Sequence, residues 1–170
     1  MLFSDAGKAV RFEEDDVRPM GRQAHGVRGM RLAEDGSQRV ISMLVAADEA
    51  QTVLTATENG FGKRTAIAEY TRHGRGTKGM IAIQQSERNG KVVAATLVRP
   101  EDEIMLITDR GVLVRTRVSE IRELGRATQG VTLIALDDGS ALSGLQRIVE
   151  NDANDVGAAD GDTAPNEENS

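Results

Sequence analysis

The stretch Gly74-Arg-Gly-Thr-Lys-Gly79 decides the fold, because a Gly-Arg-x-x-x-Gly hexapeptide occurs three times at an almost constant interval. Its counterparts are Gly21–Gly26, 53 residues earlier, and Gly125–Gly130, 51 residues later. Ten residues before each hexapeptide stands an arginine, at Arg11, Arg64 and Arg115. Self-similarity with a period of about fifty residues is typical of a repeat architecture.

Short runs that alternate apolar or β-branched residues with polar ones predict four strands in each repeat. Turn dipeptides such as Asn59-Gly60, Asn89-Gly90 and Asp138-Gly139 separate several of these runs. The pattern predicts an all-β, propeller-like fold of three four-stranded antiparallel blades, about twelve strands with almost no helix. The strands expected in the second and third repeats are Thr52–Thr57, Lys63–Ala68, Met80–Gln84, Val92–Val98, Ile104–Thr108, Val112–Thr116, Val131–Leu136 and Ala141–Ile148.

Six glycines hold equivalent places in the three repeats and are expected to be structural. They should superpose from blade to blade, since a glycine tolerates the positive φ that tight turns require. They are Gly7, Gly60 and Gly111 in one set, and Gly26, Gly79 and Gly130 in the other.

Charge divides the chain into a body and a tail. Seven of the 27 acidic residues lie in 150–170, where there is no lysine or arginine, which leaves 20 acids against 21 bases in 1–149. We therefore expect a β domain over 1–149, with repeats at about 1–50, 51–102 and 103–149, and an acidic disordered tail over 150–170. Because the first repeat aligns only from partway along its first strand, a larger parent protein is expected.

Several classes of function find no support in the sequence. There is no cysteine and no apolar run long enough for a bilayer. His25 and His73 do not superpose as a metal pair, and Gly74–Gly79 lacks the spacing of a phosphate-binding P-loop. Aromatic residues make up 2% of the chain, too few for a platform that stacks single-stranded bases. No catalytic residues, metal site or cofactor site are therefore expected.

The basic residues of the repeat predict contacts with a polyanion. Cations that neutralise phosphates release condensed counterions, which drives binding to duplex DNA without base readout. The candidates for DNA contact are Arg72, Arg75 and Lys78 in the densest basic loop, Arg22 and Arg126 at the position of Arg75, and Lys63 and Arg64 in the second strand. A structural role stays open for the arginines, which could instead bond to carbonyls of a neighbouring blade or to Asp16, Glu69 and Glu120.

Segments 1–12, 56–65, 115–121, 125–131 and 144–149 resemble the later blades of the DNA gyrase A C-terminal domain family. The resemblance implies a β-pinwheel, a relative of the propeller that wraps DNA and supports ATP-dependent negative supercoiling. It also implies a parent complex of gyrase A with gyrase B in the bacterial cytoplasm, associated with the nucleoid, with ATP and Mg²⁺ bound elsewhere in the complex. The family's hallmark Gln-Arg-Arg-Gly-Gly-Lys-Gly box is not intact, since His73–Gly79 keeps only Arg75, Gly76, Lys78 and Gly79.

Two alternatives remain open from the sequence. One is the equivalent domain of topoisomerase IV, a decatenating enzyme, and the other is a propeller scaffold that binds a protein partner. The tail has two interpretations as well, a solvated spacer or a polyanion that competes with DNA for the basic loops.

Overall fold

The computed structural model describes residues 1–149, which form short strands and three turns of 3₁₀ helix. No α-helix occurs among these residues, and no helix in this part of the chain is long and apolar enough to cross a membrane. The elements in order are β1 Leu2–Ser4, β2 Lys8–Val10, η1 Glu14–Asp16, β3 Val40–Met43, β4 Thr52–Thr57, β5 Phe61–Ala66, η2 Ile67–Glu69, β6 Met80–Ile81, β7 Val92–Val98, β8 Glu103–Thr108, β9 Leu113–Arg117, η3 Val118–Glu120, β10 Val131–Thr132 and β11 Leu142–Ile148.

Neighbouring repeats exchange strands. The sheets have the orders β3-β1-β2-β6, β10-β5-β4-β7 and β11-β8-β9, and all of their paired strands are antiparallel. In the first sheet, β6 of the second repeat pairs with β2, so that Ala9 faces Met80. In the second sheet, β10 of the third repeat pairs with β5, so that Gly62 faces Val131. The third strand of a repeat thus completes the sheet of the repeat before it.

The all-β, bladed fold predicted from the sequence is confirmed, but the strand count differs. Eleven strands are present in 1–149, because the third sheet has three strands instead of four. Its outer strand β9 has no further strand beside it among the described residues, and Leu113 on it is 60% exposed. In the first two sheets the corresponding outer strand, β6 or β10, comes from the following repeat.

Equivalent glycines lie where the repeats touch. A Cβ on Gly7 would come within 2.6 Å of the Ile83 carbonyl oxygen, and one on Gly60 within 2.5 Å of the equivalent oxygen of Ile134. A Cβ on Gly79 would meet the Ala9 carbonyl oxygen at 2.4 Å, and one on Gly130 the Gly62 oxygen at 2.7 Å. The strand exchange therefore requires glycine at these positions. All six glycines of the two sets, including Gly26 and Gly111, have a φ between 71° and 81°.

The core lies between the faces of successive sheets. Phe3, Val53, Ile67 and Tyr70 are among the buried residues between the first and second sheets, and Phe3 meets Tyr70 edge to face at 5.9 Å between ring centroids. A second cluster, with Leu54, Ile104, Leu106, Val118 and Leu142, fills the space between the second and third sheets.

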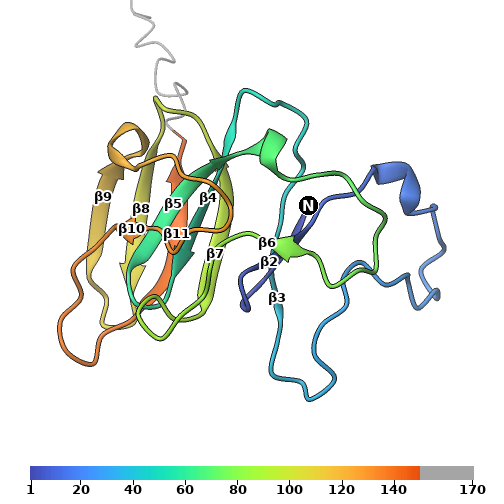
Figure 1. The fold of residues 1–170 in the computed structure, drawn as a ribbon, viewed down its shortest axis with the longest axis horizontal. Coiled ribbons are helices and arrows are strands. Elements are labelled where there is room, and N and C mark those ends of the chain that lie inside the picture. The colour runs from blue at the N-terminus through green and yellow to red at the C-terminus, as the bar shows by residue number, and fades with distance from the viewer. Residues whose placement is uncertain (150–170) are drawn as a thin grey trace, which may run out of the picture.

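The sheets have an inner and an outer edge. Strands β3, β7 and β11 contact one another in sequence and form the inner edge, where the three sheets meet. Strands β6, β10 and β9 end the sheets on the opposite, outer edge. In Figure 1 the second and third sheets lie together, and the first sheet stands beside β7 with the long 12–39 connection reaching beyond it. The acidic tail predicted at 150–170 lies outside the described residues.

Two glycine-to-alanine substitutions test the close approach between repeats. Gly79 and Gly26 have nearly the same φ, +78° and +79°, but a Cβ on Gly26 would meet nothing within 4 Å. Gly26→Ala should therefore cost only the left-handed strain, about 1 kcal/mol of unfolding free energy. Gly79→Ala should cost about 3 kcal/mol, because the Ala9 backbone must also move. Urea unfolding of both variants measures the difference, and equal losses would show that β6 does not pack closely on β2.

Candidate nucleic-acid interface

A Gly-Arg loop follows each of the 3₁₀ helices η1, η2 and η3. Loop 1 is Gly21–Gly26, loop 2 is Gly74–Gly79 and loop 3 is Gly125–Gly130. Loop 2 leads directly into β6 and loop 3 into β10, so strand exchange places each of these loops against the preceding repeat. The outer edge therefore presents equivalent basic loops at successive blades.

The loop arginines bond to the preceding repeat in the same way. Arg75 donates from Nη1 to the Arg28 carbonyl at 3.2 Å and from Nε to the Asp16 carbonyl at 2.9 Å. Arg126 donates from Nη1 to the carbonyl of Ile81, the counterpart of Arg28, at 2.8 Å. Its backbone N–H also donates to the Glu69 carboxylate at 2.9 Å. These bonds to the neighbouring blade fix where each guanidinium lies.

The same arginines keep donors for a ligand. A guanidinium has five N–H groups, of which the described bonds use two in Arg75 and one in Arg126. Both side chains are half-buried. Each arginine can therefore hold its loop to the preceding blade and still offer N–H groups to an oxyanion.

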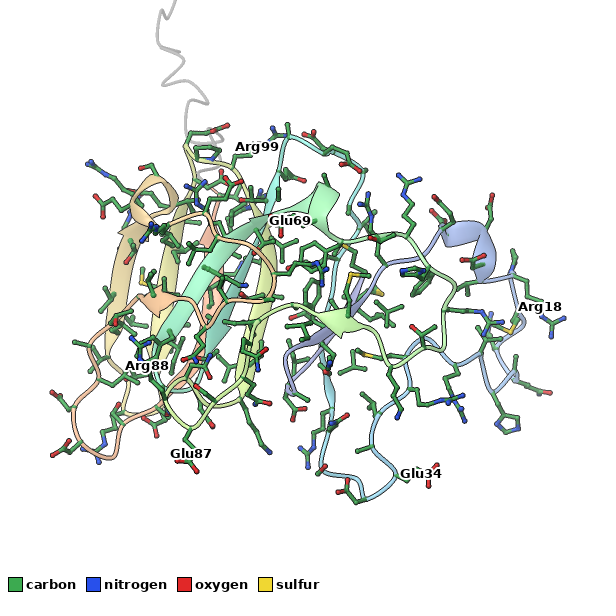
Figure 2. The ribbon with its side chains drawn as sticks, viewed as in Figure 1. Arg18, Glu34, Glu69, Glu87, Arg88 and Arg99 are labelled. Carbon is green, nitrogen blue, oxygen red and sulfur yellow. The ribbon has the colours of Figure 1, made fainter. Side chains whose placement is uncertain are left out.

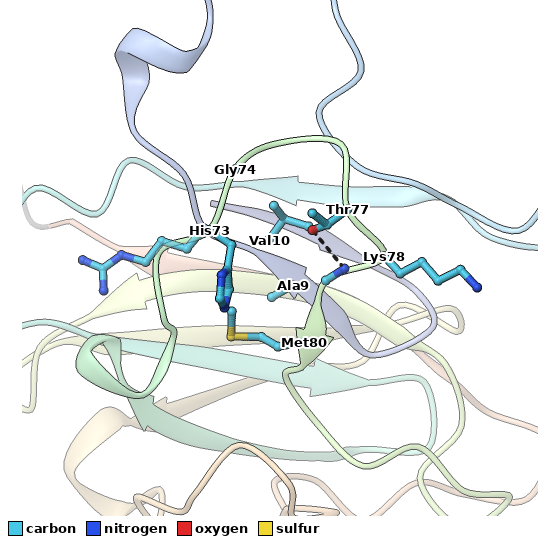
Figure 3. Close-up of a pocket in the computed structure, with 9 residues that line it drawn as sticks. Ala9, Val10, His73, Gly74, Thr77, Lys78 and Met80 are labelled. Atoms are coloured by element: carbon cyan, nitrogen blue, oxygen red, sulfur yellow. Dashed lines mark hydrogen bonds between the residues drawn. The ribbon is translucent and has the colours of Figure 1, made fainter.

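The other predicted loop cations are exposed. Lys78 points from loop 2 away from Ala9 and Val10, and its ammonium has no hydrogen bond or ion pair within 1–149 (Figure 3). Arg72 forms an ion pair with Glu13 and has Glu49 at 4.0 Å, so a phosphate would have to compete with carboxylates there. Arg22, in loop 1, is also exposed and makes no side-chain bond to another described residue.

Arg64 belongs to a repeated structural contact. It donates from Nε to the Ile121 carbonyl at 2.7 Å, just as Arg11 donates from Nη1 to the equivalent carbonyl of Tyr70 at 3.1 Å. Arg11 donates to the Ile67 carbonyl as well, at 3.0 Å, and is buried. The arginine in or directly after the second strand of a repeat thus bonds to the residue that ends the 3₁₀ helix of the following repeat.

Lys63 has no exposed surface and is not placed to meet a phosphate. Its Nζ donates to the carbonyls of Gly125 and Arg126, both at 2.5 Å, and to Thr128 Oγ1 at 3.1 Å. Burial lowers the pKa of this ammonium to about 8, opposed by Glu69 and assisted by Arg126. Because Lys63 is buried, it does not belong to the proposed set of DNA contacts. The alternating strand pattern could not reveal this, since it does not distinguish a buried ammonium from an exposed one.

The structure adds two cations that the sequence argument missed. Arg28 and Arg31 are exposed and lie beside loop 2, since the Gly76 N–H donates to Gly29 O at 2.7 Å and the Arg31 N–H to Thr77 O at 2.8 Å. Their repeat counterparts, Ile81 and Gln84, are uncharged, so only a departure from the repeat pattern could have revealed them. We call Arg28, Arg31, Arg75 and Lys78 the loop-2 patch. Figure 2 shows Arg18, also exposed, on the same 12–39 connection, where it projects outward.

Acidic residues limit the patch on one side. Glu14, Asp15 and Asp16 of η1 are exposed, and the Asp16 backbone touches Arg75. The described residues contain no group of histidines and acids that could hold a metal ion. What remains at the patch is a surface of cations beside glycine-rich backbone, which suits a polyanion that approaches closely.

Comparison with protein families accounts for the whole repeat. The family of the DNA gyrase C-terminal domain, beta-propeller, matches residues 1–47, 51–99 and 102–148, one match for each repeat. This chain belongs to the DNA gyrase C-terminal domain family. The resemblance seen in the sequence is thereby confirmed, and the chain corresponds to this domain and not to the catalytic part of gyrase A.

Among the relatives of this chain are gyrase A proteins of several bacteria. It is 53% identical to DNA gyrase A of Klebsiella oxytoca over 99% of this chain and 19% of the relative. It is 52% identical to the same protein of Escherichia coli K12, over 96% and 18%. The chain thus spans about a fifth of the length of these relatives.

Two solved structures of C-terminal domains have the same fold. A DNA gyrase A C-terminal domain superposes with a TM-score of 0.77 at 29% identity, over 87% of this chain and 50% of that chain. The C-terminal domain of a DNA topoisomerase IV superposes with a TM-score of 0.80 at 22% identity, over 86% and 45%. The second likeness concerns the fold alone.

The lowered pKa of Lys63 predicts how stability changes at alkaline pH. The folded state loses this proton near pH 8, whereas the unfolded chain keeps it until about 10.4. Between these values the unfolded state binds more protons, so the stability contribution of Lys63 rises with pH. From pH 7 to pH 10 the unfolding free energy of the wild type should gain about 2 kcal/mol relative to Lys63→Met. Chemical denaturation across this range gives the difference, and a constant difference would mean that the ammonium is not desolvated.

Proposed function

We propose that this chain binds duplex DNA without sequence specificity and bends it along the outer edge of its blades. In the parent enzyme this wrapping supports ATP-dependent negative supercoiling by gyrase. The loop-2 patch is the observation that carries the proposal. Its four cations come from two adjacent repeats and form no ion pair within the described part of the chain.

The chemistry of the patch favours a phosphate backbone over base edges. Most of the free energy of sequence-independent DNA binding comes from counterions that cationic side chains release. Contacts to phosphates orient the duplex but carry no sequence information. The described residues contain no α-helix that could enter the major groove. A patch built from loops on an outer edge therefore matches nonspecific contact with the sugar-phosphate backbone.

The geometry of the repeat supports contact at more than one blade. Arg75 and Arg126 bond to equivalent carbonyls of the preceding repeat, so their guanidinium groups occupy equivalent places on successive blades. Cations repeated along an edge attract successive phosphates of one duplex. The deformation energy of the DNA, of the order of 1–6 kcal/mol for a smooth bend over a short site, is offset by the added contacts.

On this proposal the chain acts within gyrase, joined to the rest of gyrase A and assembled with gyrase B. It works on the chromosome in the bacterial cytoplasm, at the nucleoid, while the ATP and Mg²⁺ used in the reaction are bound elsewhere. The high identity to gyrase A proteins favours gyrase over topoisomerase IV, whose C-terminal domain is similar at the level of fold.

Removing two cations of the loop-2 patch should weaken binding to any duplex. Arg28→Gln with Lys78→Gln leaves the carbonyl of Arg28, which accepts the bond from Arg75, in place. The slope of log K against log salt should fall by about 1.8, roughly 0.9 for each lost phosphate contact. Fluorescence anisotropy with two unrelated duplexes between 50 and 200 mM salt gives affinity and slope, and the loss should be the same for both sequences.

A control with the same change in charge tests whether position matters. Arg39 and Lys91 are exposed and lie near Asp5, at the β1–β2 turn and away from loop 2. Arg39→Gln with Lys91→Gln should leave the salt slope within about 0.5 of the wild type. If both double variants lose the same slope, binding depends on net charge and the patch has no special role. Salt-insensitive capture of a protein partner, with no DNA binding, would favour a scaffold instead.

The acidic tail should lower the affinity of residues 1–149 for DNA. Residues 150–170 contain seven acids and no base, and they are tethered directly to the last repeat. Tethering gives such a polyanion a high effective concentration near the basic loops, and salt screens it within about 8–10 Å. Deleting 151–170 should raise duplex affinity several-fold at low salt and hardly at all at high salt. Equal low-salt affinities in the same anisotropy assay would make the tail a spacer.

A further inference from the structure

Lys63 occupies the inside of loop 3. Its ammonium has three N–H groups, and each meets an oxygen of the loop, namely Gly125 O, Arg126 O and Thr128 Oγ1. Thr128 Oγ1 donates in turn to Gly125 O at 2.8 Å, which closes a turn over residues 125–128. The loop is therefore folded around a cation that belongs to the preceding repeat.

Loop 2 has the same anchors as loop 3. The His73 N–H donates to Arg11 O at 2.9 Å before loop 2, as the Leu124 N–H donates to Arg64 O at 2.8 Å before loop 3. Within the loops, Thr77 O accepts from Arg31 and Thr128 O accepts from Gln84, both at 2.8 Å. Each loop therefore enters and leaves its neighbour blade at equivalent points.

The inside of loop 2 is different. Val10 stands at the place of Lys63, and beneath the loop is a cavity of about 370 Å³, lined by Val10, Met80 and the loop itself (Figure 3). Gly76 has a φ of +76°, a conformation that its counterpart Ala127 does not adopt. Within 1–149 no hydrogen bond reaches the carbonyl oxygen of Gly74 or Arg75. Two loops with the same anchors thus differ where one has an internal ammonium and the other has none.

We propose that Lys63 is a positioning residue for DNA binding, whose ammonium holds loop 3 closed and presents Arg126 on the outer edge. This rests on the proposed function, and it assigns different roles to the two loops. Loop 3 is preorganised before DNA arrives, whereas loop 2 keeps the freedom to adapt its backbone around a phosphate. Preorganisation lowers the ordering cost of a contact.

The charges around Lys63 agree with this role. Glu69 attracts the ammonium, and its carboxylate also accepts the Arg126 backbone N–H, so one acid holds both the loop and the lysine. The positive charge of Lys63 repels the guanidinium of Arg126. That repulsion disfavours an arginine folded back into the loop and leaves its free N–H groups toward the outside.

The test substitutes the two internal residues separately, as Lys63→Met and Val10→Lys, with Lys91→Met as an exposed control. Amide hydrogen exchange in the free chain reports on loop order, and anisotropy reports on DNA. Lys63→Met should speed exchange at residues 126–128 roughly tenfold or more, since the loop loses its three hydrogen bonds to the ammonium. It should also lower the salt slope by about 0.9, one phosphate contact. Val10→Lys should slow exchange at residues 75–77 by a similar factor, and Lys91→Met should change neither region.

Three results would overturn the proposal. The first is unchanged exchange in loop 3 of Lys63→Met, and the second is faster exchange there with an unchanged salt slope. If Lys63→Met also exposes the amides of β4, the variant has unfolded and Val10→Lys becomes the deciding variant. The third overturning result is then that Val10→Lys adds no protection against exchange in loop 2. Failure of the wild type to bind DNA would reject the proposed function, whereas the exchange measurements would still test whether Lys63 orders loop 3.

Discussion

The pairing of each third strand with the preceding repeat is the interaction on which the rest of the structure depends. A two-residue strand such as β6 or β10 has little stability of its own. Gly79 and Gly130, which precede these strands, and Gly7 and Gly60 of the preceding repeats let the two backbones approach. Ala82 and Leu133, which follow these strands, donate to the carbonyls of Gly7 and Gly60 at 2.8 Å each. The apolar cores lie between the sheets that these strands link.

The basic edge is a consequence of this exchange. Because loops 2 and 3 lead into the exchanged strands, they lie on a neighbouring blade, and Arg75 and Arg126 bond to its carbonyls. The arginines are therefore both structural and available, and a choice between the two roles is not required. The repeats differ at individual loop positions, such as Lys63 against Val10 and Arg28 against Ile81, within the same arrangement of strands.

The sequence predicted the repeats, the all-β class and some strands to the residue, including Thr52–Thr57 and Val92–Val98. It could not predict the exchange, because the third strands of similar repeats are similar and each could pair with its own repeat or with its neighbour. The expected strand Met80–Gln84 is only Met80–Ile81 in the structure. After Ile81 the pairing with β2 ends, because the N–H groups of Ala82 and Ile83 both donate to the carbonyl of Gly7. In the site, the exposure of Arg22, Arg72 and Lys78 followed from their loops, whereas the burial of Lys63 depends on a loop 62 residues away. The roles of the cations toward DNA stay predictions.

Disulfide trapping between β2 and the third strand tests the exchange most directly, and the chain has no cysteine to interfere. Ala9 faces Met80 in the exchanged sheet, and in a self-contained repeat it would face Val27, the equivalent of Met80 in its own repeat. Paired strand positions bring Cα atoms within the range that a disulfide bridges. The account predicts that Ala9→Cys with Met80→Cys forms an intramolecular disulfide on mild oxidation and that Ala9→Cys with Val27→Cys does not. The reverse outcome would contradict it.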